Sequence, residues 1–179
     1  MPYGSVIPGL EIHGVSAPYP VVNERAIRAT AGLMLVIGLS TFWYVFLTKD
    51  YTPMPYVVGA FWLDFFLKTV LGPQWSYFGL IGRWLVRGQR AEYVGAVQKR
   101  FAWGMGLLMA SAMLVVGVWL EIRGIAPMAI CLTCLFFMWL ESAAGVCVGC
   151  KIYNGLVKRG ILPRPQHQPA CPGGSCSIS

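Results

Sequence analysis

Long apolar segments alternate with shorter polar or basic stretches along the chain. The apolar segments run from about Ile27 to Leu47, Met54 to Leu71, Phe101 to Ile122 and Ile125 to Cys150. A helix of about 20 residues crosses the roughly 30 Å hydrocarbon core of a bilayer. The pattern therefore predicts four transmembrane helices, and the short link at residues 123–124 makes the last two an antiparallel hairpin.

The stretch from residue 73 to residue 99 is amphipathic rather than apolar. Its aromatic and aliphatic side chains fall near one helical face, while Arg83 and Arg87 fall elsewhere. A segment this short and basic predicts a helix in the membrane interface, between spans 2 and 3. Residues 1–22 and 158–179 are rich in Pro and Gly and are expected to be irregular. The chain is thus expected to be an all-α integral membrane protein, with a four-helix membrane domain at residues 23–157 and Asn23 as the first N-cap.

Composition supports the membrane assignment. The chain has 179 residues, of which 56% are apolar and 12% charged, whereas soluble domains carry about 25% charged residues. These values exclude a soluble enzyme, a disordered chain and a secreted mini-protein. The lipid bilayer is the partner they imply.

The charge of +7 indicates an orientation. With four spans, both termini and the central connector lie on one side, which carries eleven of the fourteen lysines and arginines. The positive-inside rule then places both termini in the cytoplasm. The excess of cations is explained by topology, so nucleic acid is not expected as a partner.

Three ionisable residues fall inside predicted spans, where each is costly unless paired or hydrated. Asp64 and Lys68 are four residues apart and can pair along one face. Lys68 and Glu141 both lie roughly 21 Å from the outer ends of their helices, so they could also meet across the bundle. Two interpretations stay open: an ion pair that fixes helix register, or a path for protons or substrate.

Small and basic residues gather near the inner end of the bundle. Ala102, Gly106 and Ala110 recur every four residues, a spacing that favours close helix packing. Arg28 and Arg100, together with Lys68, are expected to surround the inner end of the fourth helix. They could attract an anion there, or simply contact lipid phosphates.

Six cysteines form three pairs, all late in the chain: Cys131 with Cys134, Cys147 with Cys150, and Cys171 with Cys176. On one continuous helix the first two pairs would lie about 24 Å apart. The tail pair could fold back to Cys147 and Cys150. Cytosolic thiols are normally reduced, so reactive, sulfur-carrying or metal-bound cysteines are favoured over structural disulfides.

Three chemistries fit the pair Cys147 and Cys150 together with the tail pair, Cys171 and Cys176. They are thiol–disulfide exchange, persulfide transfer and a zinc site of four thiolates. For Cys131 and Cys134, two merely buried small residues remain an alternative. The histidines, His13 and His167, lie outside the spans, which excludes a bis-histidine haem. No cofactor is predicted beyond the possible zinc ion.

Three motifs resemble those of a family of small bacterial membrane proteins, domain-of-unknown-function family 4395. They are VNERAIRATAG, KRFAWGMG and LESAAGVCVGCKIY, between residues 22 and 153. The resemblance implies a four-helix domain in the bacterial cytoplasmic membrane, and a thioredoxin-like or sulfur-carrier partner, without an established activity. The motif positions it marks here are Asn23, Glu24, Arg28, Lys99, Arg100, Phe101, Glu141, Cys147 and Cys150.

The leading functional hypothesis is a membrane protein that handles thiols or reduced sulfur at its cytoplasmic mouth. Cys147 and Cys150 would react, Cys171 and Cys176 would exchange with them, and Glu141 would pair with Lys68 or relay a proton. The cations Arg28, Lys68 and Arg100 would stabilise thiolates or attract an anion. The alternatives are a non-catalytic accessory subunit of a larger membrane complex and a transporter component for a sulfur anion. The sequence leaves open whether the protein is an enzyme.

Overall fold

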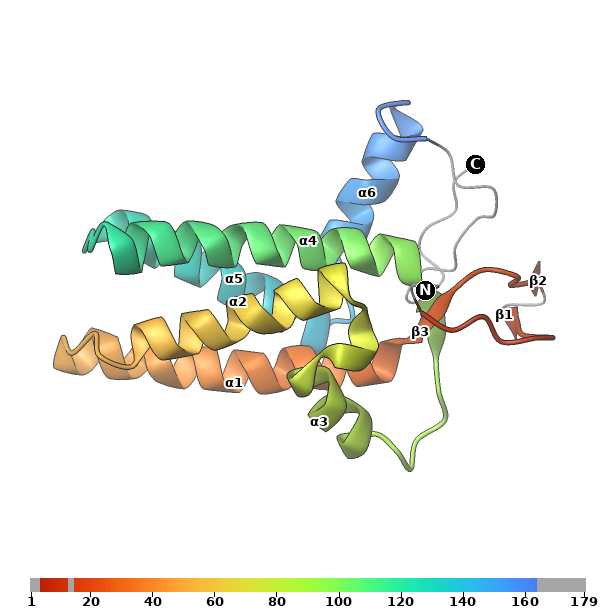
Figure 1. Cartoon of the computed structure of the whole chain (residues 1–179), viewed down its shortest axis with the longest axis horizontal. Helices are drawn as coiled ribbons and strands as arrows, with labels where there is room; N and C mark the ends of the chain where they lie inside the picture. Colours follow the sequence, from red (N-terminus) through yellow and green to blue (C-terminus); the bar gives the residue numbers. More distant parts are fainter. Residues whose placement is uncertain (1–3, 13–14, 164–179) are drawn as a thin grey trace.

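The computed structural model describes residues 4–12 and 15–163, and it is mostly helical. Four long helices lie side by side (Figure 1), namely α1 (Glu24–Thr48), α2 (Met54–Val70), α4 (Ala96–Met113) and α5 (Ile125–Ser142). A π-helical segment, η2 (Leu114–Trp119), continues α4. Helix α2 packs on α4 and α1 packs on α5, while α1–α2 and α4–α5 contacts close the bundle.

Three of these helices are long and apolar enough to cross a membrane. They are α1, α4 with its π-helical continuation, and α5, within the part of the chain that the structure describes. The fourth bundle helix, α2, has 17 residues. The prediction of a mostly helical protein with helices able to cross a membrane is therefore confirmed.

The two ends of the bundle differ. The connections from α1 to α2 and from α4 to α5 lie at one end, which we call the loop end (Figure 1). The other end carries the short strands β3 (Val21–Asn23) and β4 (Tyr93–Gly95), and we call it the β end. The helices α3 (Tyr77–Leu85) and α6 (Val148–Lys158) also lie at the β end.

Short strands add to the all-α fold expected from the sequence. Strand β1 (Glu11–Ile12) pairs with β2 (Val15–Ser16), and β3 pairs with β4, both antiparallel. In the second pair Val22 lies opposite Val94. Strand β3 runs directly into α1 and strand β4 directly into α4, so their pairing places the starts of these two helices next to each other. The predicted N-cap is confirmed, since the Asn23 side chain accepts a hydrogen bond from the Arg25 amide.

The amphipathic connector is only partly helical. A 3₁₀ turn, η1 (Pro73–Trp75), precedes α3, and residues 96–99 already belong to α4. Ser76 is the N-cap of α3, and its hydroxyl accepts a hydrogen bond from the Gly79 amide. The Tyr77 hydroxyl donates to the Ala60 carbonyl of α2, and burial raises the pKa of Tyr77 to about 12. The helix predicted over residues 73–99 is therefore shorter and anchored on the bundle.

The fourth predicted helix is wrong in its last third, after Ser142. Helix α5 ends at Ser142, and α6 leaves the bundle at a steep angle (Figure 1). Between them Gly145 adopts φ +64°, a left-handed conformation that glycine takes without steric cost. Cys147 and Cys150 consequently lie on a separate short helix and not on the helix that carries Cys131 and Cys134.

Candidate functional site

Cys147 and Cys150 are joined by a disulfide at the start of α6. Cys147 is the N-cap of this helix, and its Sγ accepts the Cys150 amide at 3.3 Å. A helix N-terminus carries a partial positive charge, which stabilises a thiolate. The sequence favoured reactive cysteines over a disulfide, whereas the structure joins the two sulfurs. A C-x-x-C pair that alternates between dithiol and disulfide would be consistent both with the predicted reactivity and with the bond between the two sulfurs.

Helix α6 is docked tightly on α4. A Cβ atom at Gly149, between the two cysteines, would lie 2.6 Å from both Cα and Cβ of Ala102. The Gln98 Nε2 donates to Asn154 Oδ1 at 2.9 Å in a buried position. These contacts confirm Ala102 as a close-packing position. They also hold the cysteine pair against the β end of the bundle, with both cysteines buried.

An ion cluster ties three helices together at the same end. The Lys99 Nζ of α4 lies 2.7 Å from Glu24 Oε2 of α1 and 2.5 Å from Glu141 Oε1 of α5. Glu24 and Lys99 are almost fully buried, and the Glu141 side chain is 17% exposed. The expected partner of Glu141 was Lys68, and the structure corrects this to Lys99.

Sequence reasoning missed this role of Lys99 because the residue was assigned to the connector, outside the spans. Once α4 begins at Ala96, Lys99 falls in its first turn, beside the start of α1. The signal that could have found the cluster lay in the family motifs, which mark Glu24, Lys99 and Glu141 together.

The ion pair predicted between Asp64 and Lys68 of α2 forms. Lys68 Nζ lies 2.5 Å from Asp64 Oδ2. Asp64 Oδ1 also accepts hydrogen bonds from the Ser76 hydroxyl at 2.7 Å and the Phe78 amide at 3.1 Å. Because these two donors form the start of α3, Asp64 anchors α3 on α2. This geometry fits the interpretation of a pair that fixes helix positions.

The two arginines that the sequence placed near the inner end of the fourth helix, Arg28 and Arg100, contact backbone carbonyls. Arg28 donates to the carbonyls of Ser142 and Ala143, and its guanidinium covers Gly145. Arg28 therefore supplies hydrogen-bond donors to the last carbonyl groups of α5, beside the loop that leads to Cys147. The Arg100 Nε donates to Thr69 O at 3.0 Å, near the end of α2. Of the three cations expected at the site, Arg28 is the one placed on the cysteine loop.

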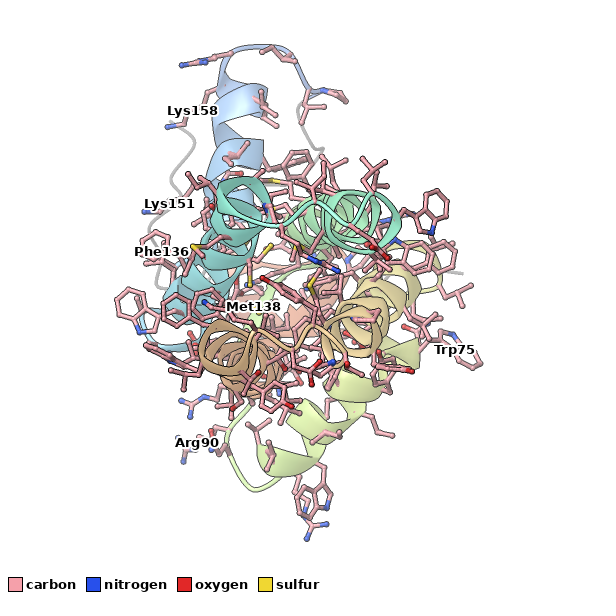
Figure 2. The ribbon with its side chains drawn as sticks, turned by 90° about the vertical axis from the view of Figure 1, so that its left-hand side faces the viewer. Trp75, Arg90, Phe136, Met138, Lys151 and Lys158 are labelled. Carbon is pink, nitrogen blue, oxygen red and sulfur yellow. A yellow bond between two sulfur atoms is a disulfide. The ribbon has the colours of Figure 1, made fainter. Side chains whose placement is uncertain are left out.

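A cavity of about 450 Å³ lies between α1, α2, α4 and α5. Its lining is mainly apolar, and at the β end it reaches Lys99, Glu141, Val148 and Gly149. Every methionine in the described part of the chain lines it: Met34, Met54, Met105, Met109, Met113, Met128 and Met138. Figure 2, which looks along the bundle from the loop end, shows sulfur atoms gathered between the helices.

Cys131 and Cys134, the pair nearer the loop end, also line this cavity, and we call them the outer pair. Cys131 and Cys134 are half-buried on α5, and neither forms a disulfide within the described residues. Cys134 Sγ lies 4.0 Å from Met109 Sδ of α4. The pair therefore faces a thioether across the bundle interior.

The tail pair, Cys171 and Cys176, lies outside the described residues. Its exchange with Cys147 and Cys150, and a zinc site built from all four, stay predictions. Within residues 4–12 and 15–163, no three His, Cys, Asp or Glu side chains are grouped so that they could hold a metal ion.

A comparison with protein families matches most of the chain. The model of a domain of unknown function, DUF4395, matches residues 22–158. No curated protein and no solved structure is similar enough to be matched to this chain.

Proposed function

The chain belongs to the DUF4395 family, and we propose that it is a membrane protein of thiol–disulfide exchange whose reactive pair is Cys147 and Cys150. One observation carries the proposal. Cys147 caps the N-terminus of α6, a helix that protrudes from the bundle, and is bonded to Cys150 in its first turn. This arrangement stabilises a thiolate on Cys147 when the pair is reduced.

The exchange balances without a further reagent. The Cys147 thiolate attacks one sulfur of a partner disulfide, forming a mixed disulfide and releasing a partner thiolate, which takes up a proton. The Cys150 thiolate then attacks Cys147 Sγ, forming the intramolecular disulfide and releasing the second partner thiol. The partner gains two electrons and the pair loses two. The reverse sequence oxidises a partner dithiol.

The partner is either the tail pair or a separate thioredoxin-like or sulfur-carrier protein. From Cys150 to its end at Lys158, helix α6 carries the chain about 12 Å. Residues 159–170 can span up to about 40 Å, which is enough chain for Cys171 and Cys176 to return to α6.

The ion cluster would serve proton movement. Lys99 is the one cation between the carboxylates of Glu24 and Glu141. With both carboxylates ionised, this three-residue cluster has a net charge of minus one. Glu141 lines the cavity together with Val148 and Gly149, the residues between the two cysteines. We assign Glu141, supported by Glu24 and Lys99, the role of holding a proton that the thiols release or take up.

Four spans with the β end in the cytoplasm form part of the same proposal. The 17 residues of α2 are within the range that can span a bilayer. The cations Arg25 of α1 and Arg83 of α3, with Arg87 and Arg90 between α3 and β4, lie in segments at the β end. The bacterial cytoplasmic membrane, with both termini inside, agrees with this distribution.

A non-catalytic accessory subunit is the second candidate. One observation favours it: Cys147 is 3% exposed and Cys150 is 1% exposed. A disulfide so deeply covered could serve only to lock the corner between the bundle and α6. In that case the exposed apolar side chains of the bundle would contact a larger membrane complex.

The two candidates separate in an exchange assay on the full-length protein in detergent micelles. Cys147→Ser keeps an oxygen at the N-cap, so α6 retains its cap. Cys150→Ser leaves the attacking thiol without its resolving partner on α6, and both variants are made with Cys171→Ser and Cys176→Ser so that the tail cannot take its place. With a thioredoxin-type disulfide as substrate, we expect Cys150→Ser to accumulate a mixed disulfide through Cys147, and Cys147→Ser to form none.

Cys131→Ser is the matched control and should exchange like the wild-type protein. Equal inertness of the wild-type protein and both α6 variants would favour the accessory subunit. A mass spectrum that shows sulfane sulfur on Cys147 or Cys150 in the native protein would favour persulfide transfer instead.

A further inference from the structure

We infer that Cys131, Cys134 and Met109 form a binding site for a soft monovalent metal ion of the Cu(I) class inside the bundle cavity. The site shares no residue with the Cys147–Cys150 pair and does not depend on the proposed exchange activity. It gives a role to the outer cysteine pair, which that activity leaves unused.

Geometry is the first support. Cys131 and Cys134 are three residues apart on α5, so their side chains emerge on the same helical face. Met109 approaches from α4, with its Sδ 4.0 Å from Cys134 Sγ. Metal–sulfur bonds are about 2.3 Å long, so two sulfurs on one ion lie about 3.8–4.0 Å apart at tetrahedral to trigonal angles. The observed sulfur separation therefore fits an ion between the two helices.

Ligand type is the second support. Thiolate and thioether sulfurs select soft ions such as Cu(I), whereas zinc sites also draw on His and carboxylates. The described residues offer no group of three His, Cys, Asp or Glu side chains. They do offer two unbonded thiols and a thioether in one cavity.

Charge distinguishes the ion further. A monovalent cation that displaces one thiol proton leaves the site neutral, since one thiolate, one thiol and one thioether remain as ligands. A divalent cation leaves the site neutral only if both thiols lose their protons, and zinc in addition takes four ligands, one more than two thiolates and one thioether supply. The site is thus suited to Cu(I) or Ag(I) rather than Zn²⁺.

The cavity gives such an ion further thioethers to contact. Met105, Met109 and Met113 recur every four residues on α4, and all three line the cavity, as do Met128 and Met138 of α5. In Figure 2, Met138 lies toward the space between the helices, whereas Phe136 points outward. Sulfur ligands therefore continue along the cavity on both sides of the site.

Methionine also fills irregular gaps in apolar cores, and this role can be separated from metal binding. Leucine has nearly the same volume, so it replaces a packing methionine at little cost. It cannot replace a thioether ligand. Met34 offers the matched comparison, because it is buried in the same cavity but packs among Phe61 and Phe78, with its Sδ 3.9 Å from Lys68 Nζ rather than near a thiol.

The test is a Cu(I) titration of the full chain in detergent under anaerobic conditions, in competition with a chromogenic Cu(I) chelator. Cys147, Cys150, Cys171 and Cys176 are replaced by Ser so that only the outer pair can bind. We expect one equivalent of Cu(I), with affinity lowered by ~100-fold in Cys131→Ser/Cys134→Ser and by about tenfold in Met109→Leu. Met34→Leu should bind like its parent.

The Met109→Leu and Met34→Leu comparison is repeated in the otherwise wild-type chain, whose fold needs no serine substitution. X-ray absorption of the bound copper should show sulfur neighbours alone. The proposal is overturned if the parent fails to compete for Cu(I), if both leucine variants lose affinity equally, or if Zn²⁺ binds at this pair as tightly as Cu(I). None of these outcomes bears on exchange at Cys147 and Cys150, which has its own assay.

Discussion

At Gly149 the absence of a side chain determines how close α6 lies to α4. A Cβ there would overlap the backbone and side chain of Ala102, whereas a Cβ at Gly155, on the same helix, would meet nothing within 4 Å. The two glycines of α6 therefore have different functions. Only the one between the cysteines is required for docking.

We expect Gly149→Ala to lower the free energy of unfolding by about 1–3 kcal/mol, because the added methyl group forces α6 away from α4. Gly155→Ala should be neutral or stabilise by up to about 1 kcal/mol, since alanine is the better helix former. Thermal unfolding of both variants in the same detergent measures the difference. Equal effects would contradict the close contact with Ala102.

Cys147 has a structural function besides its proposed chemistry, because its Sγ caps α6. Cys147→Ala and Cys147→Ser both remove the disulfide, but only serine supplies a capping oxygen. Cys147→Ala should therefore be less stable than Cys147→Ser by about 0.5–2 kcal/mol. Helix content and thermal unfolding of the two variants test this, and identical stabilities would show that the cap contributes nothing.

At the scale of elements, Lys99 joins α1, α4 and α5 where β3 and β4 have already aligned two of their starts. Lys99→Met leaves two carboxylates buried without a cation. We expect this variant to lose about 3–5 kcal/mol of stability. Adding Glu24→Gln and Glu141→Gln should restore most of the loss, because the uncompensated charges are gone.

The exposed Lys151→Met of α6 serves as the control and should change stability by no more than about 0.5 kcal/mol. Thermal unfolding of the single, triple and control variants provides the measurement. If the triple variant is no more stable than Lys99→Met, buried charge is not the cause of the loss.

The elements that the sequence predicted well are those whose own pattern specifies them. The first two helices match their apolar segments within a few residues, and Asp64 with Lys68 forms the pair that helical spacing suggested. Strands β3 and β4 have three residues each and pair across about 70 residues of chain, so no local period marks them.

The candidate site was predicted less completely, because it depends on a helix break. Residues 143–147 are small and apolar, so they extend the apolar run of α5 in the sequence. The break depends instead on the left-handed Gly145 and on Arg28, which comes from α1 and binds the carbonyls at the end of α5. Such long-range contacts cannot be read from hydropathy. They move Cys147 from the C-terminal end of the predicted fourth helix to the N-cap of α6.

At the scale of the whole molecule, the proposed orientation makes a prediction about access. In a chain whose native cysteines are replaced by serine, Arg90→Cys lies in the connector at the β end and Thr52→Cys lies at the loop end; both positions are exposed. A membrane-impermeant maleimide added to intact cells should label Thr52→Cys, and should label Arg90→Cys only after lysis. The opposite pattern would reverse the orientation and place α6 outside the cytoplasm.

The reduction potential of the Cys147–Cys150 pair tests the central claim most directly. It is obtained by counting free thiols by mass spectrometry after equilibration of the full-length protein in thiol–disulfide buffers of graded potential. A pair that exchanges electrons with thioredoxin-like partners should titrate as a two-electron couple between about −120 and −270 mV. A disulfide that resists reduction below about −300 mV would be structural, and that result would contradict the account.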